Sequence, residues 1–171
     1  LKERICKALG EDGNDVWAST FHSTCAKILR RHADEIGYTH NFTIYDSDDS
    51  KRAAKECIKR LGYDEKMIPV KSVLAEISRA KDELITPAEF ISTNQEHIRL
   101  KKIGEVYEEY QRFLKAADAM DFDDLIVNMV KLLRTNKETR EYYQNRFKYI
   151  MVDEYQDTNH AQYVLTALLA A

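Results

Sequence analysis

The sequence contains few of the residues that interrupt regular structure, with two prolines and five glycines among 171 residues. This scarcity favours a helical protein over a turn-rich β fold. No apolar run approaches the roughly 20 residues that are needed to span a bilayer, and no apolar signal segment opens the chain. We therefore expect no membrane partner.

Cysteine is scarce as well. Cys6, Cys25 and Cys57 are far apart, odd in number and never in a Cys-x-x-Cys pattern, so neither a disulfide framework nor a zinc site is indicated. A reducing cytoplasm is the expected location. The net charge of −3 does not mark the chain as a nucleic-acid binder, so any such role must depend on local basic faces.

Helical periodicity and start signals cover most of the chain. Thr86 and Glu89 form a capping box with Pro87 at the first helical position. Asp121 and Asp124 are expected to cap a helix whose buried face begins at Phe122, because carboxylates at a helix start interact favourably with the helix dipole. Helices are predicted at residues 21–36, 47–61, 71–83, from 87, 95–117, from 121, from a capping box at 135–138, and after 158.

Tyr149–Val152 has the apolar, β-forming composition of a short strand buried on both faces, as in a parallel sheet. Asp153 and Glu154 follow at once, where open α/β sheets bind ligands. Adjacent residues on an extended backbone point to opposite sides. Side chains on opposite sides of the strand could have different roles, one carboxylate holding a metal ion and the other orienting a water molecule. The alternative is that the Asp-Glu pair is only a solvated helix start or part of a turn.

Three segments resemble one family. Residues 153–157 resemble the Walker B segment, DExxQD, of superfamily 1 helicases, and the longer string DEYQDTN-x-AQY resembles their PcrA/UvrD/Rep branch. Residues 20–23, Thr-Phe-His-Ser, resemble motif Ib of that branch, and residues 120–126 resemble its MDFDDLI stretch. The resemblance implies part of an ATP-dependent 3′-to-5′ DNA helicase or translocase that uses Mg²⁺ and ATP.

The family roles transfer to specific residues. By resemblance, Asp153 holds Mg²⁺ beside the nucleotide phosphates and Glu154 positions the attacking water. Gln156 is expected at the catalytic site and Asp157 at the nucleotide-binding site. The resemblance gives each of them only a coupling or structural role.

The same resemblance makes Thr20, Phe21, His22 and Ser23 a turn that contacts the backbone of single-stranded DNA. Hydroxyls and amides at a helix start favour phosphate, although a Thr before a helix is often only an N-cap. Lys55 and Lys59 lie on a basic face of the helix at 47–61. That face is either a solvated surface or a contact for duplex DNA.

The resemblance divides the chain into three parts. Residues 1–40 and 119–171 would belong to the RecA-like subdomain 1A, starting in the last turns of a helix and stopping before motif III. Residues 41–118 would form the helical subdomain 1B, inserted within 1A. Only Val16–Thr20 and Tyr149–Val152 are expected as strands of the 1A sheet. We therefore predict a mainly α fold, in which helical 1B is inserted in a truncated RecA-like α/β remnant.

Phosphoryl transfer in this class needs the sequence G-x-x-x-x-G-K-[ST], and the isolated glycines at 10, 13, 37, 62 and 104 never form it. We therefore expect the chain alone neither to hydrolyse ATP nor to hold ATP and Mg²⁺. Three alternatives stay open: a helicase–nuclease subunit of the AddA/RecB kind, a non-catalytic helical DNA- or protein-binding module, and a carboxylate-metal phosphohydrolase. The sequence names no protein partner.

Overall fold

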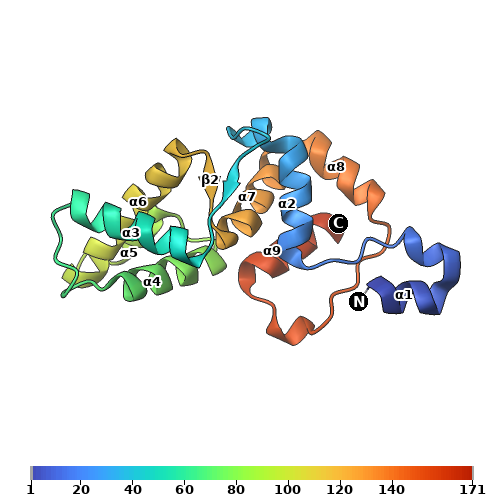
Figure 1. Cartoon of the computed structure of the whole chain (residues 1–171), viewed down its shortest axis with the longest axis horizontal. Helices are drawn as coiled ribbons and strands as arrows, with labels where there is room; N and C mark the ends of the chain where they lie inside the picture. The colour runs from blue at the N-terminus through green and yellow to red at the C-terminus, as the bar shows by residue number, and fades with distance from the viewer. Residues whose placement is uncertain (1, 171) are drawn as a thin grey trace.

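The computed structural model describes residues 2–170 and confirms a mainly helical fold (Figure 1). Its α-helices are α1 (Lys2–Leu9), α2 (Phe21–His32), α3 (Ser47–Arg60), α4 (Val70–Asp82), α5 (Pro87–Thr93), α6 (Ile98–Ala116), α7 (Phe122–Thr135), α8 (Lys137–Arg146) and α9 (His160–Ala170). Short 3-10 helices are η1 (Gly10–Asn14), η2 (Ala33–Ile36) and η3 (Tyr155–Asp157). No helix within residues 2–170 is long and apolar enough to cross a membrane.

Two apolar cores divide these helices into two lobes. The split lobe is built from both halves of the chain, with core side chains from α2, η2, α7, α8 and α9. The middle lobe has core side chains from α3, α4, α5 and α6. Figure 1 shows the two lobes side by side, with α1 and η1 at the far end of the split lobe. No residue of α1 is buried.

The chain crosses between the lobes twice, and the two crossings are paired strands. β1 (Thr43–Ile44) and β2 (Ala119–Met120) run parallel, with Thr43 opposite Ala119 and Ile44 opposite Met120. The boundary between the two cores also lies at these crossings. Ile44 and Met120 pack in the split lobe, whereas Tyr45, directly after β1, and Ala119 pack in the middle lobe. Local sequence signals indicated only an extended connector at 41–45.

Local capping explains where helices begin. The predicted box at Thr86 and Glu89 is confirmed, as is the cap at Asp121 and Asp124, and α3 begins with the same box at Asp46. The capping box expected at 135–138 is wrong. Asn136 caps α8 instead by accepting from the backbone N of Thr139 at 3.0 Å.

Both strands expected for the RecA-like remnant are absent, so that part of the prediction is wrong. Val16–Thr20 and Tyr149–Val152 form no ladder in the structure. Tyr149 and Met151 are 94% and 96% exposed, whereas Ile150 is partly buried against the split-lobe core. The segment thus has one covered face and one open face. A strand requires hydrogen-bonded neighbours that its own residues cannot supply.

Lys81, at the end of α4, lies buried between the lobes and is only 2% exposed. Its Nζ is 2.7 Å from Asp121 Oδ2 and 2.9 Å from Asp124 Oδ1, on the first turn of α7. Tyr110 donates to Asp121 Oδ2 at 2.9 Å, and Gln111 donates to Asp124 Oδ1 at 3.1 Å. The remaining oxygen of each aspartate accepts the capping-box hydrogen bond from the other's backbone N.

One cation thus faces two carboxylates in this site, which we call the Lys81 cluster (Lys81, Tyr110, Gln111, Asp121 and Asp124). Burial raises the pKa of Asp124 to about 6. Burial alone would also raise the pKa of Asp121, but the ammonium of Lys81 holds that pKa below its ordinary value. Because the folded state binds the Asp124 proton more tightly than the unfolded chain does, this group contributes stability at acidic pH that is lost as pH rises through about 6.

We expect Lys81→Met to lower the free energy of unfolding by about 3–5 kcal/mol at pH 7, because it leaves two buried carboxylates without a cation. The loss should be smaller at pH 4.5, where protonation removes carboxylate charge. Urea unfolding of the two proteins at both pH values measures the difference. Lys51→Met is the control, since Lys51 and Asp48 form an exposed pair worth at most about 1 kcal/mol. Equal losses at both pH values would contradict this account.

Candidate functional site

The turn at residues 20–23 begins α2. Thr20 is extended, and its Oγ1 accepts from the backbone N of Ser23 at 3.2 Å. The Thr20 hydroxyl also donates to Ser23 Oγ at 3.0 Å. The N-cap role is therefore confirmed, whereas contact with DNA stays a prediction. Thr20 and Ser23 are exposed, so both hydroxyls can reach a ligand at this end of the helix.

His22 and Phe122 join this turn to the start of α7. Their ring centroids are 6.1 Å apart and the rings are perpendicular. Phe122 is 52% exposed, which corrects the prediction that it begins the buried face of its helix. Phe21, by contrast, is partly buried against the split-lobe core. An exposed aromatic ring beside an imidazole and two hydroxyls offers both a stacking surface and hydrogen-bond donors.

The acidic segment at 153–157 lies in the loop between α8 and α9, which bends away from both lobes (Figure 1). Asp153, Glu154, Gln156 and Asp157 are all exposed. Glu154 has a left-handed backbone (φ 50°, ψ 44°), and its N–H donates to Asp153 Oδ1 at 3.0 Å. A left-handed residue other than glycine costs about 1–2 kcal/mol. Because these residues lie in an exposed loop, the predicted position at the end of a buried strand is wrong.

The acidic segment does not form a magnesium site by itself. Among the described residues, no group of three or more His, Cys, Asp or Glu side chains could hold a metal ion. Mg²⁺ is ordinarily held by one or two carboxylates together with substrate phosphates and water. Asp153 fits one such ligand, with its Oδ1 accepting a hydrogen bond from the backbone N–H of Glu154. No hydrogen bond or ion pair recorded for residues 2–170 joins the acidic segment to the turn at 20–23.

The basic face of α3 is largely neutralised by neighbouring carboxylates. Lys55 lies 3.8 Å from Glu65, and both side chains are exposed. Lys59 is exposed and forms no ion pair within residues 2–170. The other basic residues of α3 pair in the same way: Lys51 with Asp48, Arg52 with Asp49, and Arg60 with Glu56 and Glu109. The geometry thus favours a solvated surface, with Lys59 as the cation most available to phosphate.

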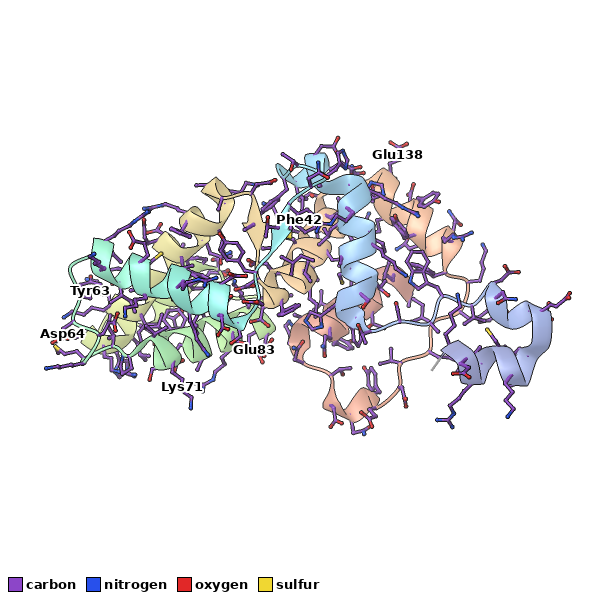
Figure 2. The ribbon with its side chains drawn as sticks, viewed as in Figure 1. Phe42, Tyr63, Asp64, Lys71, Glu83 and Glu138 are labelled. Carbon is purple, nitrogen blue, oxygen red and sulfur yellow. The ribbon has the colours of Figure 1, made fainter. Side chains whose placement is uncertain are left out.

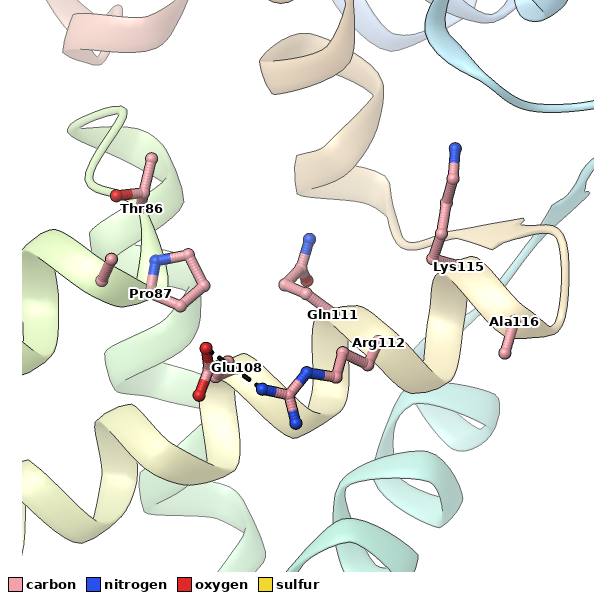
Figure 3. Close-up of a pocket in the computed structure, with 8 residues that line it drawn as sticks. Thr86, Pro87, Glu108, Gln111, Arg112, Lys115 and Ala116 are labelled. Atoms are coloured by element: carbon pink, nitrogen blue, oxygen red, sulfur yellow. Dashed lines mark ion pairs between the residues drawn. The ribbon is translucent and has the colours of Figure 1, made fainter.

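An open hollow of about 640 Å³ lies on the middle lobe, between the start of α5 and the last turns of α6 (Figure 3). Glu108 and Arg112 form an exposed ion pair on its wall. None of the predicted site residues lines this hollow. It therefore adds no ligand to either predicted site.

Comparison with known proteins identifies the family. The model of the UvrD/REP helicase N-terminal domain matches residues 1–171. This chain belongs to the UvrD/REP helicase family. It is 45% identical over 171 residues to the ATP-dependent DNA helicase PcrA of Staphylococcus aureus (strain Mu50), a match that covers 100% of this chain and 23% of the relative. The PcrA of Staphylococcus epidermidis (strain ATCC 12228) is 45% identical over 170 residues, which are 99% of this chain and 23% of that protein.

The chain therefore spans about a quarter of the length of these helicase relatives. Sequence reasoning found the two candidate segments that carry the family motifs but missed two features of the site. It assigned Phe122 to the core, because periodicity cannot show where a helix leaves its neighbours. It also did not predict Lys81 as a partner of Asp121 and Asp124, although two adjacent carboxylates in an apolar setting require a cation.

We expect Met151→Lys to change the free energy of unfolding by less than about 0.5 kcal/mol, because the side chain is exposed. Leu165→Ala, which truncates a buried side chain of α9, should lower it by about 2–5 kcal/mol. Urea unfolding of the three proteins makes the comparison. A loss above about 1 kcal/mol for Met151→Lys would mean that the segment is a buried strand, as the sequence predicted.

Proposed function

We propose that this chain is part of a DNA helicase motor that couples ATP hydrolysis to 3′-to-5′ movement on single-stranded DNA and to duplex unwinding. The observation that carries the proposal is the match of the whole chain to the UvrD/REP helicase N-terminal domain. The relatives' name, ATP-dependent DNA helicase, agrees with it.

Asp153 would contribute a ligand to Mg²⁺, and Glu154 would orient the attacking water. Gln156 and Asp157 would serve coupling or structural parts. Their exposure supports access by a nucleotide held elsewhere in a longer protein. The missing G-x-x-x-x-G-K-[ST] sequence supports a further proposal, that residues 1–171 alone neither bind nor hydrolyse ATP.

The turn Thr20–Ser23 together with Phe122 would contact single-stranded DNA. Hydroxyls and backbone amides at the start of α2 suit phosphate oxygens. The exposed ring of Phe122 suits stacking on a base, which is tolerant of sequence. Duplex DNA would be contacted by Lys55 and Lys59 on α3. The pairing of Lys55 with Glu65 weakens that part, so Lys59 would carry most of it.

The domain boundaries also stay a proposal. Residues 1–40 and 119–171 would belong to subdomain 1A, and residues 41–118 would form subdomain 1B. The two apolar cores support this division, because the middle-lobe core draws its side chains from residues 45–119. The fully buried side chains of the split-lobe core come from before and after that range, and from within it the partly buried Leu84 also packs against this core.

In the full-length protein, we expect Glu154→Gln to lower the kcat of DNA-stimulated ATP hydrolysis by roughly a hundredfold or more, because a neutral amide cannot take a proton from water. Nucleotide affinity should be retained. Steady-state ATPase assays and nucleotide titration test this, with Glu138→Gln on α8 as a matched control (Figure 2 shows Glu138). Unchanged turnover would instead favour a non-catalytic helical binding module.

Phe122→Ala should weaken binding of single-stranded DNA by roughly tenfold, because stacking contributes about 1–3 kcal/mol per base. Fluorescence anisotropy with a labelled oligonucleotide, without ATP, measures the affinity of the full-length protein. Tyr142→Ala is the control, since Tyr142 is 55% exposed on α8 and lies outside the proposed surface. Equal affinities of the two variants would remove Phe122 from the DNA surface.

A further inference from the structure

Two consecutive residues at the end of α4 contact the starts of two helices in the other lobe. Lys81 binds Asp121, the N-cap of α7, and Asp124, its third residue. Asp82 accepts a hydrogen bond from Asn159 Nδ2 at 3.0 Å. Figure 2 shows the next residue, Glu83, where the two lobes meet. One helix end of the middle lobe thus contacts two helix starts of the split lobe.

Asn159 occupies the same place before α9 as Asp121 does before α7. Its Oδ1 accepts from the backbone N of Gln162 at 2.9 Å, and Gln162 Oε1 accepts from the backbone N of Asn159 at 3.1 Å. This reciprocal pair fixes the first turn of α9. The Asn159 amide N–H₂ is left free to donate to Asp82, so the helix start and α4 are bound through one side chain.

Each helix start adjoins one of the segments proposed to be functional. Phe122, the first residue of α7, faces His22 in the turn at the start of α2. Asn159 follows the acidic segment 153–157 after one residue, Thr158. The residues that the end of α4 contacts are therefore next to both segments: Asp121 directly precedes Phe122, and Asn159 lies two residues after Asp157.

The two contacts differ in strength. The Lys81 contact is buried and ionic, and removing one partner leaves an uncompensated charge. The Asp82 contact is a single, partly buried hydrogen bond, which contributes far less to stability. The Lys81 contact therefore contributes most of the stability of this junction, whereas the Asp82 contact adds a second point of attachment to α9.

We propose that Lys81 and Asp82 are positioning residues through which the middle lobe orients both the proposed DNA surface and the acidic segment. A rotation of α4 would then displace the starts of α7 and α9 together. The coupling of DNA contact to ATP hydrolysis rests on the proposed function, whereas the contact of α4 with α9 does not.

Asp82→Ala tests the proposal without removing the Lys81 cluster, whose loss could unfold the chain. Asp82→Asn keeps an oxygen that accepts from Asn159. Glu83→Ala is the matched control, because it removes the same charge from an exposed neighbour. Hydrogen exchange in the 171-residue chain reports on the amide of Gln162. In the full-length protein, the ratio of kcat with and without single-stranded DNA reports on coupling.

We expect Asp82→Ala to speed exchange at Gln162 by about three- to tenfold, which is the effect of losing one hydrogen bond. It should also lower the stimulation of kcat by DNA several-fold, while Asp82→Asn and Glu83→Ala resemble the wild type in both assays. Exchange in Asp82→Ala equal to that in Glu83→Ala would overturn the positioning role. Faster exchange with unchanged stimulation would overturn the coupling.

A wild-type protein without any DNA-stimulated ATPase would instead overturn the proposed function and, with it, the coupling. The exchange result would still decide whether Asp82 holds the start of α9.

Discussion

The buried ammonium of Lys81 is the interaction on which the two-lobe structure depends. It comes from the middle lobe, and its two carboxylate partners lie on the first turn of α7 in the split lobe. All four carboxylate oxygens of Asp121 and Asp124 accept hydrogen bonds in this arrangement, although the side-chain oxygen of Gln111 is buried without a partner among the described residues. Burial makes any other arrangement costly. The pair of short parallel strands beside it supplies few hydrogen bonds and could not fix the lobes alone.

The same local sequence serves two purposes in this fold. Each strand is followed by Asp-x-Asp-Asp, at 46–49 after β1 and at 121–124 after β2, and each forms a capping box. At the first, Asp49 is partly exposed, and the backbone N–H of Asp46 and the guanidinium of Arg52 lower its pKa. At the second, the box is buried and receives Lys81. Burial, rather than the motif, makes the second one a contact between lobes.

What could be predicted from the sequence was local. Helix starts at Thr20, Thr86 and Asp121 follow from side chains that satisfy nearby backbone amides, and the structure forms each of them. The strands failed because pairing depends on distant partners. Tyr149–Val152 has the right composition, yet no segment within residues 2–170 lies beside it as a strand.

The candidate site divides in the same way. The motif residues Asp153 and Glu154 were identifiable from their order, but their exposed loop and the left-handed backbone of Glu154 were not. The exposure of Phe122 was predicted wrongly and the role of Lys81 was not predicted at all, for a shared reason. The exposure of one and the burial of the other are set by how α7 meets α2 and α4, and periodicity within one helix carries no information on that.

A double-mutant cycle between Lys81 and Asp121 tests most directly whether the buried ion contact holds the two lobes together. Free energies of unfolding are measured at pH 7 for the wild type, Lys81→Met, Asp121→Asn and the double variant. The account predicts a coupling energy of about 2 kcal/mol or more, because the second substitution removes the charge that the first leaves unpaired. Losses that add to within about 0.5 kcal/mol would contradict it.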